Sequence, residues 1–89
     1  RASKLFLGAS AFDPTVGVTS EHVSETGVNR AMIRAASERT LLIDHSKFGS
    51  VLTCLVCEAS ELDCVVTDKE APAEAIACLQ EQGIQVMCE

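Results

Sequence analysis

The stretch "LLIDHSKFGS", Leu41 to Ser50, decides which fold class the sequence predicts. It begins inside a strand-like segment, Arg39 to Asp44, whose continuous apolar character predicts a strand covered on both faces. The stretch then turns polar within one residue, and Asp44 and Lys47 stand where this strand ends. Because parallel sheets hold ligands at the carboxyl ends of their strands, both residues are candidates for ligand binding. On spacing alone, the simpler interpretation is that the two side chains pair with each other or with solvent at the end of the strand.

The residues before this strand predict another strand, a loop and a helix. "KLFLGAS", Lys4 to Ser10, is a short apolar run closed by Gly and Ser, and its length suits a strand. Ala11 to Ser20 contains an Asp-Pro pair and a glycine, which predict a loop. From Glu25 to about Ser37 the apolar residues recur at helical spacing, which predicts an amphipathic helix with an irregular start between Ser20 and Ser24. The apolar stripe of this helix consists of Val28, Ala31, Met32 and Ala35.

The residues after Ser50 repeat the alternation of strands and helices. Val51 to Ser60 is ambiguous between the two, and its Val, Thr and Cys content favours a strand around Thr53 to Cys57, followed by a turn over Ala59 to Leu62. Asp63 to Asp68 predicts a strand, and Pro72 to Gly83 predicts a helix with proline in its first turn and glycine at its end. Ile84 to Cys88 predicts the last strand. The order strand, helix, strand, repeated, predicts an α/β fold with a mostly parallel sheet and covering helices.

Composition narrows the class of protein. The chain has 89 residues, enough for one domain, and 47% of them are hydrophobic, which indicates a globular domain rather than a disordered segment. Thirteen acidic residues against seven basic ones give a net charge of −6, which disfavours nucleic acid as a direct partner of this chain. No apolar stretch approaches the roughly 20 residues that span a bilayer, so we expect a cytoplasmic protein without membrane contact.

The five cysteines form no recognisable cofactor site. Cys54 and Cys57 have the C-x-x-C spacing of metal and redox sites, but a zinc ion needs four ligands and no second pair stands at a matching distance. The alternative, reduced thiols that act as small core residues, fits an odd number of cysteines in a cytosolic protein. Neither His22 nor His45 belongs to a recognisable catalytic triad. We therefore expect no metal and no cofactor.

Two strand ends carry groups that suit a small anionic ligand. Gly8 and Ser10 follow the first strand, and the next loop brings Gly17 and Thr19 to the start of a helix. Free N–H groups at a helix N-terminus, approached by a glycine-containing loop, attract phosphate or carboxylate. Lys47, after the second strand, could add a positive charge for a phosphate.

Nearly the whole chain resembles the C-terminal effector domain of DeoR-type bacterial transcriptional repressors. The resemblance lies in "FLGAS" at 6–10, "GVT" at 17–19, "VNRAMI" at 28–33, "IDHSKFG" at 43–49 and "VVTD" at 65–68, in the order and spacing of the family. It implies a fold like that of sugar-phosphate isomerases and CoA-transferases. It also implies a domain that senses a phosphorylated sugar without transforming it.

Further expectations follow from this resemblance. The family's operator-binding winged helix-turn-helix is absent from this chain, so residues 1–89 are expected to be the C-terminal part of an effector domain that is incomplete at its N-terminus. Operator DNA is then a partner only through the missing domain, and the repressor is expected to be a homo-oligomer. The resemblance implies the following effector-binding residues: Gly8, Ser10, Gly17, Thr19, Glu25, Asn29, Asp44 and Lys47.

One departure from the family bears on activity. The family commonly has lysine at the position of Asn29, and its loss argues against residual isomerase chemistry in this chain. The alternative function is a sugar-phosphate isomerase-like enzyme fragment that uses Glu25, Asp44 and Lys47. The first interpretation predicts no catalytic residues.

Overall fold

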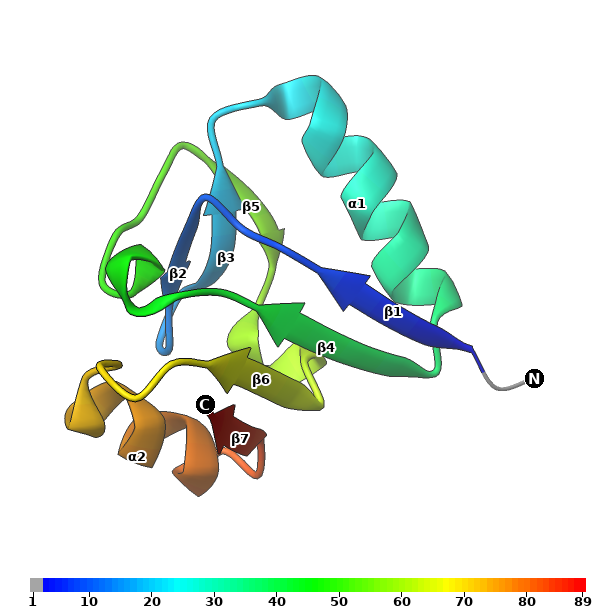
Figure 1. Ribbon diagram of the computed structural model, residues 1–89. Helices are drawn as coiled ribbons and strands as arrows, with labels where there is room; N and C mark the ends of the chain where they lie inside the picture. Colours follow the sequence, from blue (N-terminus) through cyan, green and yellow to red (C-terminus); the bar gives the residue numbers. More distant parts are fainter. Residues whose placement is uncertain (1–2) are drawn as a thin grey trace.

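A computed structural model describes residues 3–89, which form two β-sheets and two α-helices (Figure 1). The larger sheet has four strands in the order β1-β4-β6-β7, and all neighbouring pairs are parallel. Its strands are β1 (Lys4–Leu7), β4 (Glu38–Leu42), β6 (Cys64–Thr67) and β7 (Gln85–Cys88). The helices are α1 (Val23–Ala35) and α2 (Ala73–Glu81). These elements confirm the predicted α/β class with a mostly parallel sheet.

The segment Ala11 to Ser20, predicted as a loop, is instead a β-hairpin. Its strands β2 (Ala11–Asp13) and β3 (Gly17–Ser20) pair antiparallel, and β3 also pairs antiparallel with β5 (Cys54–Cys57) to form a second, smaller sheet. The Asp13 carboxylate closes the hairpin turn by accepting hydrogen bonds from the backbone N–H and the hydroxyl of Thr15. Strands this short contain too few residues for the alternation of side chains to be recognised in the sequence.

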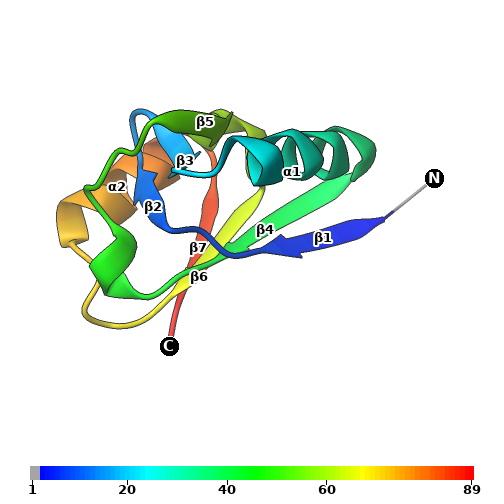
Figure 2. The same cartoon turned by 90° about the horizontal axis from the view of Figure 1, so that it is seen from above.

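All other elements lie on one face of the parallel sheet. Figure 2 shows both helices and the small sheet on the same side of the strands, and the opposite face is open. On this open face Phe6, Leu42 and Met87 are 61%, 46% and 44% exposed. The prediction that the second strand is covered on both faces is therefore wrong, because Leu41 and Ile43 are buried against the core while Leu42, between them in the sequence, is exposed.

The prediction of which face of α1 packs against the rest of the domain is also wrong. Val28 and Met32, members of the predicted apolar stripe, are 61% and 44% exposed. The helix instead packs on β5 and buries Thr26 and Ile33. A sequence pattern identifies an apolar stripe but not whether another element covers it. The start of α1 at Val23 agrees with the irregular start predicted between Ser20 and Ser24.

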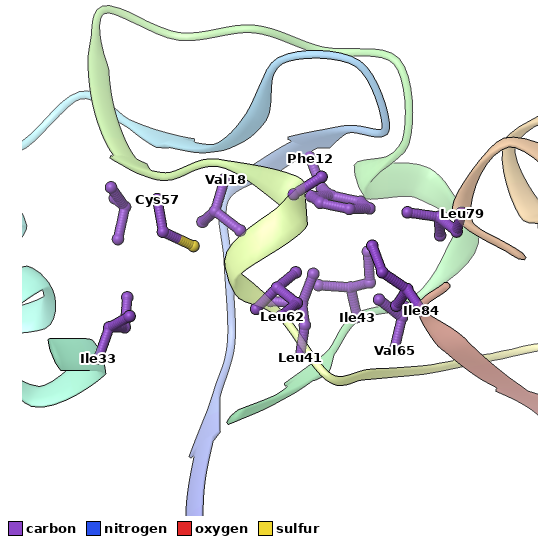
Figure 3. Close-up of a cluster of buried hydrophobic side chains, with 12 residues drawn as sticks. Phe12, Val18, Ile33, Leu41, Ile43, Cys57, Leu62, Val65, Leu79 and Ile84 are labelled. Carbon is purple, nitrogen blue, oxygen red and sulfur yellow. The ribbon is translucent and has the colours of Figure 1, made fainter. Parts of the chain in front are cut away.

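The core lies between the two sheets, where Phe12 and Val18 of the small sheet meet Leu41 and Val65 of the large one (Figure 3). Leu79 of α2 closes the core at one side and is fully buried. Neither helix in the described part of the chain is long and apolar enough to cross a membrane.

Candidate functional site

A small polar hollow lies where the chain leaves the large sheet and where α1 begins. It has a volume of about 160 Å³. It is lined by Gly8, Ala9, Ser10, Val18, Thr19, Ser20, Glu25, Asn29 and Val56. Five of the eight predicted effector-binding residues are in this set: Gly8, Ser10, Thr19, Glu25 and Asn29. Residues from three separate segments of the sequence therefore meet at one place.

The local structure explains how the lining residues reach the hollow. Gly8 and Ser10 belong to the short connection that carries the chain from β1 to β2. Thr19 is buried in β3, and its hydroxyl oxygen accepts a hydrogen bond from the Leu52 N–H at 2.8 Å. Glu25 and Asn29 are four residues apart on α1, which places them on the same side of the helix.

The start of α1 adds hydrogen-bond donors near the hollow. The Ser20 hydroxyl oxygen accepts a hydrogen bond from the His22 N–H at 3.0 Å and so fixes the entry into the helix. Within the described residues, no side chain caps the N-terminus of α1 at His22. The N–H groups of the first turn of a helix have no partners within the helix and carry a partial positive charge. In the part of the chain that the structure describes, Glu25 is the one ionisable side chain of the hollow, whose polar lining otherwise consists of hydroxyl, amide and backbone groups.

Asp44 and Lys47 do not line the hollow. They lie in and beside the 3₁₀ helix η1 (His45–Lys47), which follows β4, and the Lys47 Nζ lies 3.8 Å from the Asp44 Oδ2. Asp44 also accepts hydrogen bonds from the N–H and the hydroxyl of Ser46, and these bonds hold the pKa of its carboxyl below the usual range. The ion pair that the spacing suggested is therefore present.

Gly17 has a packing role at the start of β3. Its φ of 125° lies in the region that favours glycine, and a Cβ at this position would lie 2.2 Å from the Cys57 carbonyl oxygen. A glycine is needed here because β3 and the chain after β5 approach each other closely. Gly17 is outside the hollow.

Cys54 and Cys57 lie on β5, and both are free thiols. Burial raises the pKa of Cys57 to about 11, so its thiol stays protonated at neutral pH. Within residues 3–89, no three His, Cys, Asp or Glu side chains gather as metal ligands.

A pair that the sequence reasoning missed joins the loops after β4 and β6. His45 Nδ1 lies 3.0 Å from Asp68 Oδ2. The rule that led to Asp44, which looks for polar groups at the ends of parallel strands, also applies to Asp68 because this residue follows β6 directly.

Comparison with known proteins identifies the family. Residues 1–69 match the family described as the DeoR C terminal sensor domain. The chain belongs to this family. The DeoR C-terminal domain has a sugar-phosphate-isomerase-like fold, which agrees with the fold class predicted from the sequence.

Curated relatives of this DeoR sensor domain are transcriptional regulators. The chain is 29% identical over 83 residues to a putative aga operon transcriptional repressor of Escherichia coli O157:H7, a match that covers 93% of this chain and 31% of the relative. It is 26% identical to the HTH-type transcriptional regulator GolR of Listeria innocua, covering 96% of this chain and 34% of the relative. It is 31% identical to the HTH-type transcriptional repressor GlcR of Bacillus subtilis, a match that covers 80% of this chain and 28% of the relative. The chain thus spans about a third of the length of the relatives it matches.

Proposed function

We propose that this chain is the effector-sensing part of a cytoplasmic DeoR-type transcriptional regulator and that it binds a phosphorylated sugar metabolite. In this proposal the ligand changes how tightly a winged helix-turn-helix domain, elsewhere in a homo-oligomeric regulator, binds operator DNA. The observation that carries the proposal is the meeting of Gly8, Ser10, Thr19, Glu25 and Asn29 around one hollow.

The lining of the hollow suits the hydroxyl groups of a sugar. The Glu25 carboxylate accepts hydrogen bonds from hydroxyls, and the Asn29 amide can both donate and accept them. The hydroxyls of Ser10 and Thr19 add two further groups that can donate. A sugar held between α1 and the end of β1 would therefore meet both hydrogen-bond donors and hydrogen-bond acceptors within one small volume.

The phosphate group of the ligand needs a different environment. A phosphate beside Glu25 would be repelled, and among residues 3–89 no lysine or arginine lines the hollow to offset this repulsion. We place the phosphate outside the hollow, toward the free N–H groups at the start of α1, which favour anions. Asp44 and Lys47 remain proposed effector-binding residues on the neighbouring loop, where Lys47 supplies a positive charge.

We also propose that the chain is the C-terminal part of a larger effector domain. Two surfaces support this: Phe6, Leu42 and Met87 are exposed on the open face of the sheet, and Val28 and Met32 are exposed on α1. Parallel sheets in proteins are usually covered on both faces, so further polypeptide is the expected cover. About two-thirds of the length of these relatives lies outside the match.

Nuclear magnetic resonance (NMR) titration of the ¹⁵N-labelled chain tests the proposed site. Millimolar sugar phosphates, the matching free sugars and inorganic phosphate are added in turn. We expect a sugar phosphate to shift the amide signals of Gly8, Ser10, Thr19 and Asn29. Inorganic phosphate alone should affect mainly the start of α1.

Two variants sharpen this titration. Asn29→Ala removes one wall of the hollow and should weaken the response, while Glu81→Gln, at an exposed position on α2 away from the hollow, should leave it unchanged. A folded chain whose hollow signals respond to none of these compounds would count against the proposed site.

A further inference from the structure

The loops after β4 and β6 are joined by a histidine and an aspartate. Asp68 Oδ2 accepts a hydrogen bond from the His45 backbone N–H at 2.9 Å and lies 3.0 Å from the ring Nδ1 of the same residue. The other oxygen of Asp68 accepts a hydrogen bond from the Glu70 N–H at 2.8 Å, which orients the carboxylate. β4 and β6 are neighbouring parallel strands, so both loops leave the sheet at the same edge.

The segment that begins with His45 is also attached to the small sheet. The Gly49 N–H donates a hydrogen bond of 2.9 Å to the carbonyl oxygen of Phe12, a residue of β2. The Phe48 ring packs edge-on against the Phe12 ring, with centroids 5.7 Å apart. Residues 45–49 therefore connect the two sheets, with an apolar attachment at one end and an ionisable attachment at the other.

The charges around the His45 ring favour its protonated form. Its Nε2 lies 3.7 Å from a Glu70 carboxylate oxygen, on the side opposite Asp68, and Asp44 precedes it in the chain. The nearest cation on this loop, Lys47, is paired with Asp44. The hydrogen bond to Asp68 is the main reason that the pKa of His45 is raised, and hydrogen bonds from His45 lower the pKa of Asp68.

The charged groups on other elements near residues 45–49 do not reverse the preference of the His45 ring for its protonated form. Asp13 of β2 and Glu74 of α2 line the hollow that contains Phe48 and Gly49, and both are acidic. Lys69 lies between Asp68 and Glu70 in the sequence but forms no ion pair within the described part of the chain.

We propose that His45 and Asp68 form a proton-controlled clamp that positions the loop carrying Lys47 between the two sheets. The clamp is fully charged when the pH lies above the folded pKa of Asp68, which is below 3.8, and below the folded pKa of His45, which is above 6.5. As the pH rises through the folded pKa of His45, the ring loses its charge and the contact to Asp68 weakens. The backbone hydrogen bond to Asp68 remains, so the loop loosens without detaching. The consequence for Lys47 as an effector contact rests on the proposed function, whereas the clamp itself does not.

A pH titration of the unliganded chain, followed by NMR, tests the clamp. The ring signals of both histidines and the backbone amides are recorded from mildly acidic to mildly alkaline pH. His22, the second histidine, serves as the internal reference, since it forms no ion pair with a carboxylate in the described residues. We expect the amides of Lys47, Phe48 and Gly49 to shift with the same midpoint as the His45 ring. The protection of the Gly49 amide against hydrogen exchange should fall several-fold above that midpoint.

Three variants separate the clamp from other causes. His45→Gln should abolish the transition in the loop amides, and Asp68→Asn should move the His45 midpoint to lower pH while the chain stays folded. His22→Gln, the matched control, should leave the transition intact. Loop amides that ignore the His45 midpoint, or a transition that survives in His45→Gln, would overturn the proposal.

The outcome is independent of ligand binding. If the hollow fails to respond to sugar phosphates while the loop amides still follow His45, the proposed function fails and the clamp stands. If the hollow responds but the loop transition is missing, the clamp alone is wrong.

Discussion

Replacing two adjacent leucines by alanine tests which face of the large sheet is covered. Leu41 and Leu42 are neighbours in β4, and the sequence predicted both to be buried. In the structure Leu41 is fully buried between the sheets, while Leu42 is 46% exposed on the open face. Leu41→Ala and Leu42→Ala therefore remove the same atoms from the same strand in two different environments.

The expected loss of stability differs between the two positions. Shortening leucine to alanine removes roughly three methyl or methylene equivalents, each contributing about 0.8 kcal/mol when fully buried, or about 2.4 kcal/mol in total. At Leu41 a residual cavity adds to this loss, so we expect about 3–4 kcal/mol, within the range of about 2–5 kcal/mol for such core substitutions. At Leu42 about half of the side chain is already in water and no closed cavity forms, so we expect about 1 kcal/mol.

Urea unfolding followed by far-UV circular dichroism measures the difference, because the chain contains no Trp or Tyr to serve as a fluorescent probe. The slope of the free energy of unfolding against urea should stay the same, and the midpoint should fall much further for Leu41→Ala. Met32→Ala, on the exposed stripe of α1, should resemble Leu42→Ala. Equal losses at Leu41 and Leu42 would refute the reasoning and would mean that the open face is covered in solution.

Four other predictions concern individual residues. Gly17→Ala should destabilise the fold by about 2 kcal/mol or more, because the new Cβ meets the Cys57 carbonyl oxygen in a backbone conformation that alanine rarely adopts. Gly27→Ala, on α1 with no atoms within 4 Å of the new Cβ, should stabilise it by about 0.5–1 kcal/mol in the same urea assay. Alkylation at neutral pH, followed by mass spectrometry, should modify the exposed Cys88 first and the buried Cys57 last, because burial raises the pKa of Cys57 to about 11; early labelling of Cys57 would contradict its burial. Hydrogen bonds from Thr15 lower the pKa of Asp13, so the stability it contributes should be present above pH 3.8 and be lost as the pH falls through its lower folded pKa. Urea midpoints measured in acid should therefore fall less steeply in Asp13→Asn than in the unmodified chain.

The sequence predicted the parallel sheet well because each of its strands includes a short apolar run next to a turn signal. The run before Asp44 and the "VVTD" run both became central strands, β4 and β6. The small sheet was not predicted, because two of its three strands lie within ten residues that contain Pro14 and Gly17. Those two residues signal a turn equally well in a loop and in a hairpin.

The candidate site was predicted in part for a similar reason. Gly8, Ser10 and Thr19 follow or end strands, and Glu25 and Asn29 share one side of a helix, so local rules place them near one another. Whether Lys47 lies beside these residues depends on the path of the loop after β4. The Lys47 amine pairs with Asp44 on that same loop, and this local contact holds it there. The clamp residue Asp68 was missed although it follows a strand, because its partner is 23 residues away in the sequence.

The hollow and the clamp occupy equivalent places in the fold, and this bears on how a sensor of this kind can work. The hollow lies at the connection from β1 to β2, and the clamp holds the connection from β4 toward β5. Both connections lead from the large sheet to the small one, so each spans the apolar layer between the sheets. A ligand shifts a protein between two arrangements only if it binds one of them better than the other. Under the proposed function, a sugar that contacts β3, α1 and the end of β1 at once would bind best in one relative position of the two sheets. A rigid core transmits such a preference over the whole domain, because packed side chains resist gradual deformation.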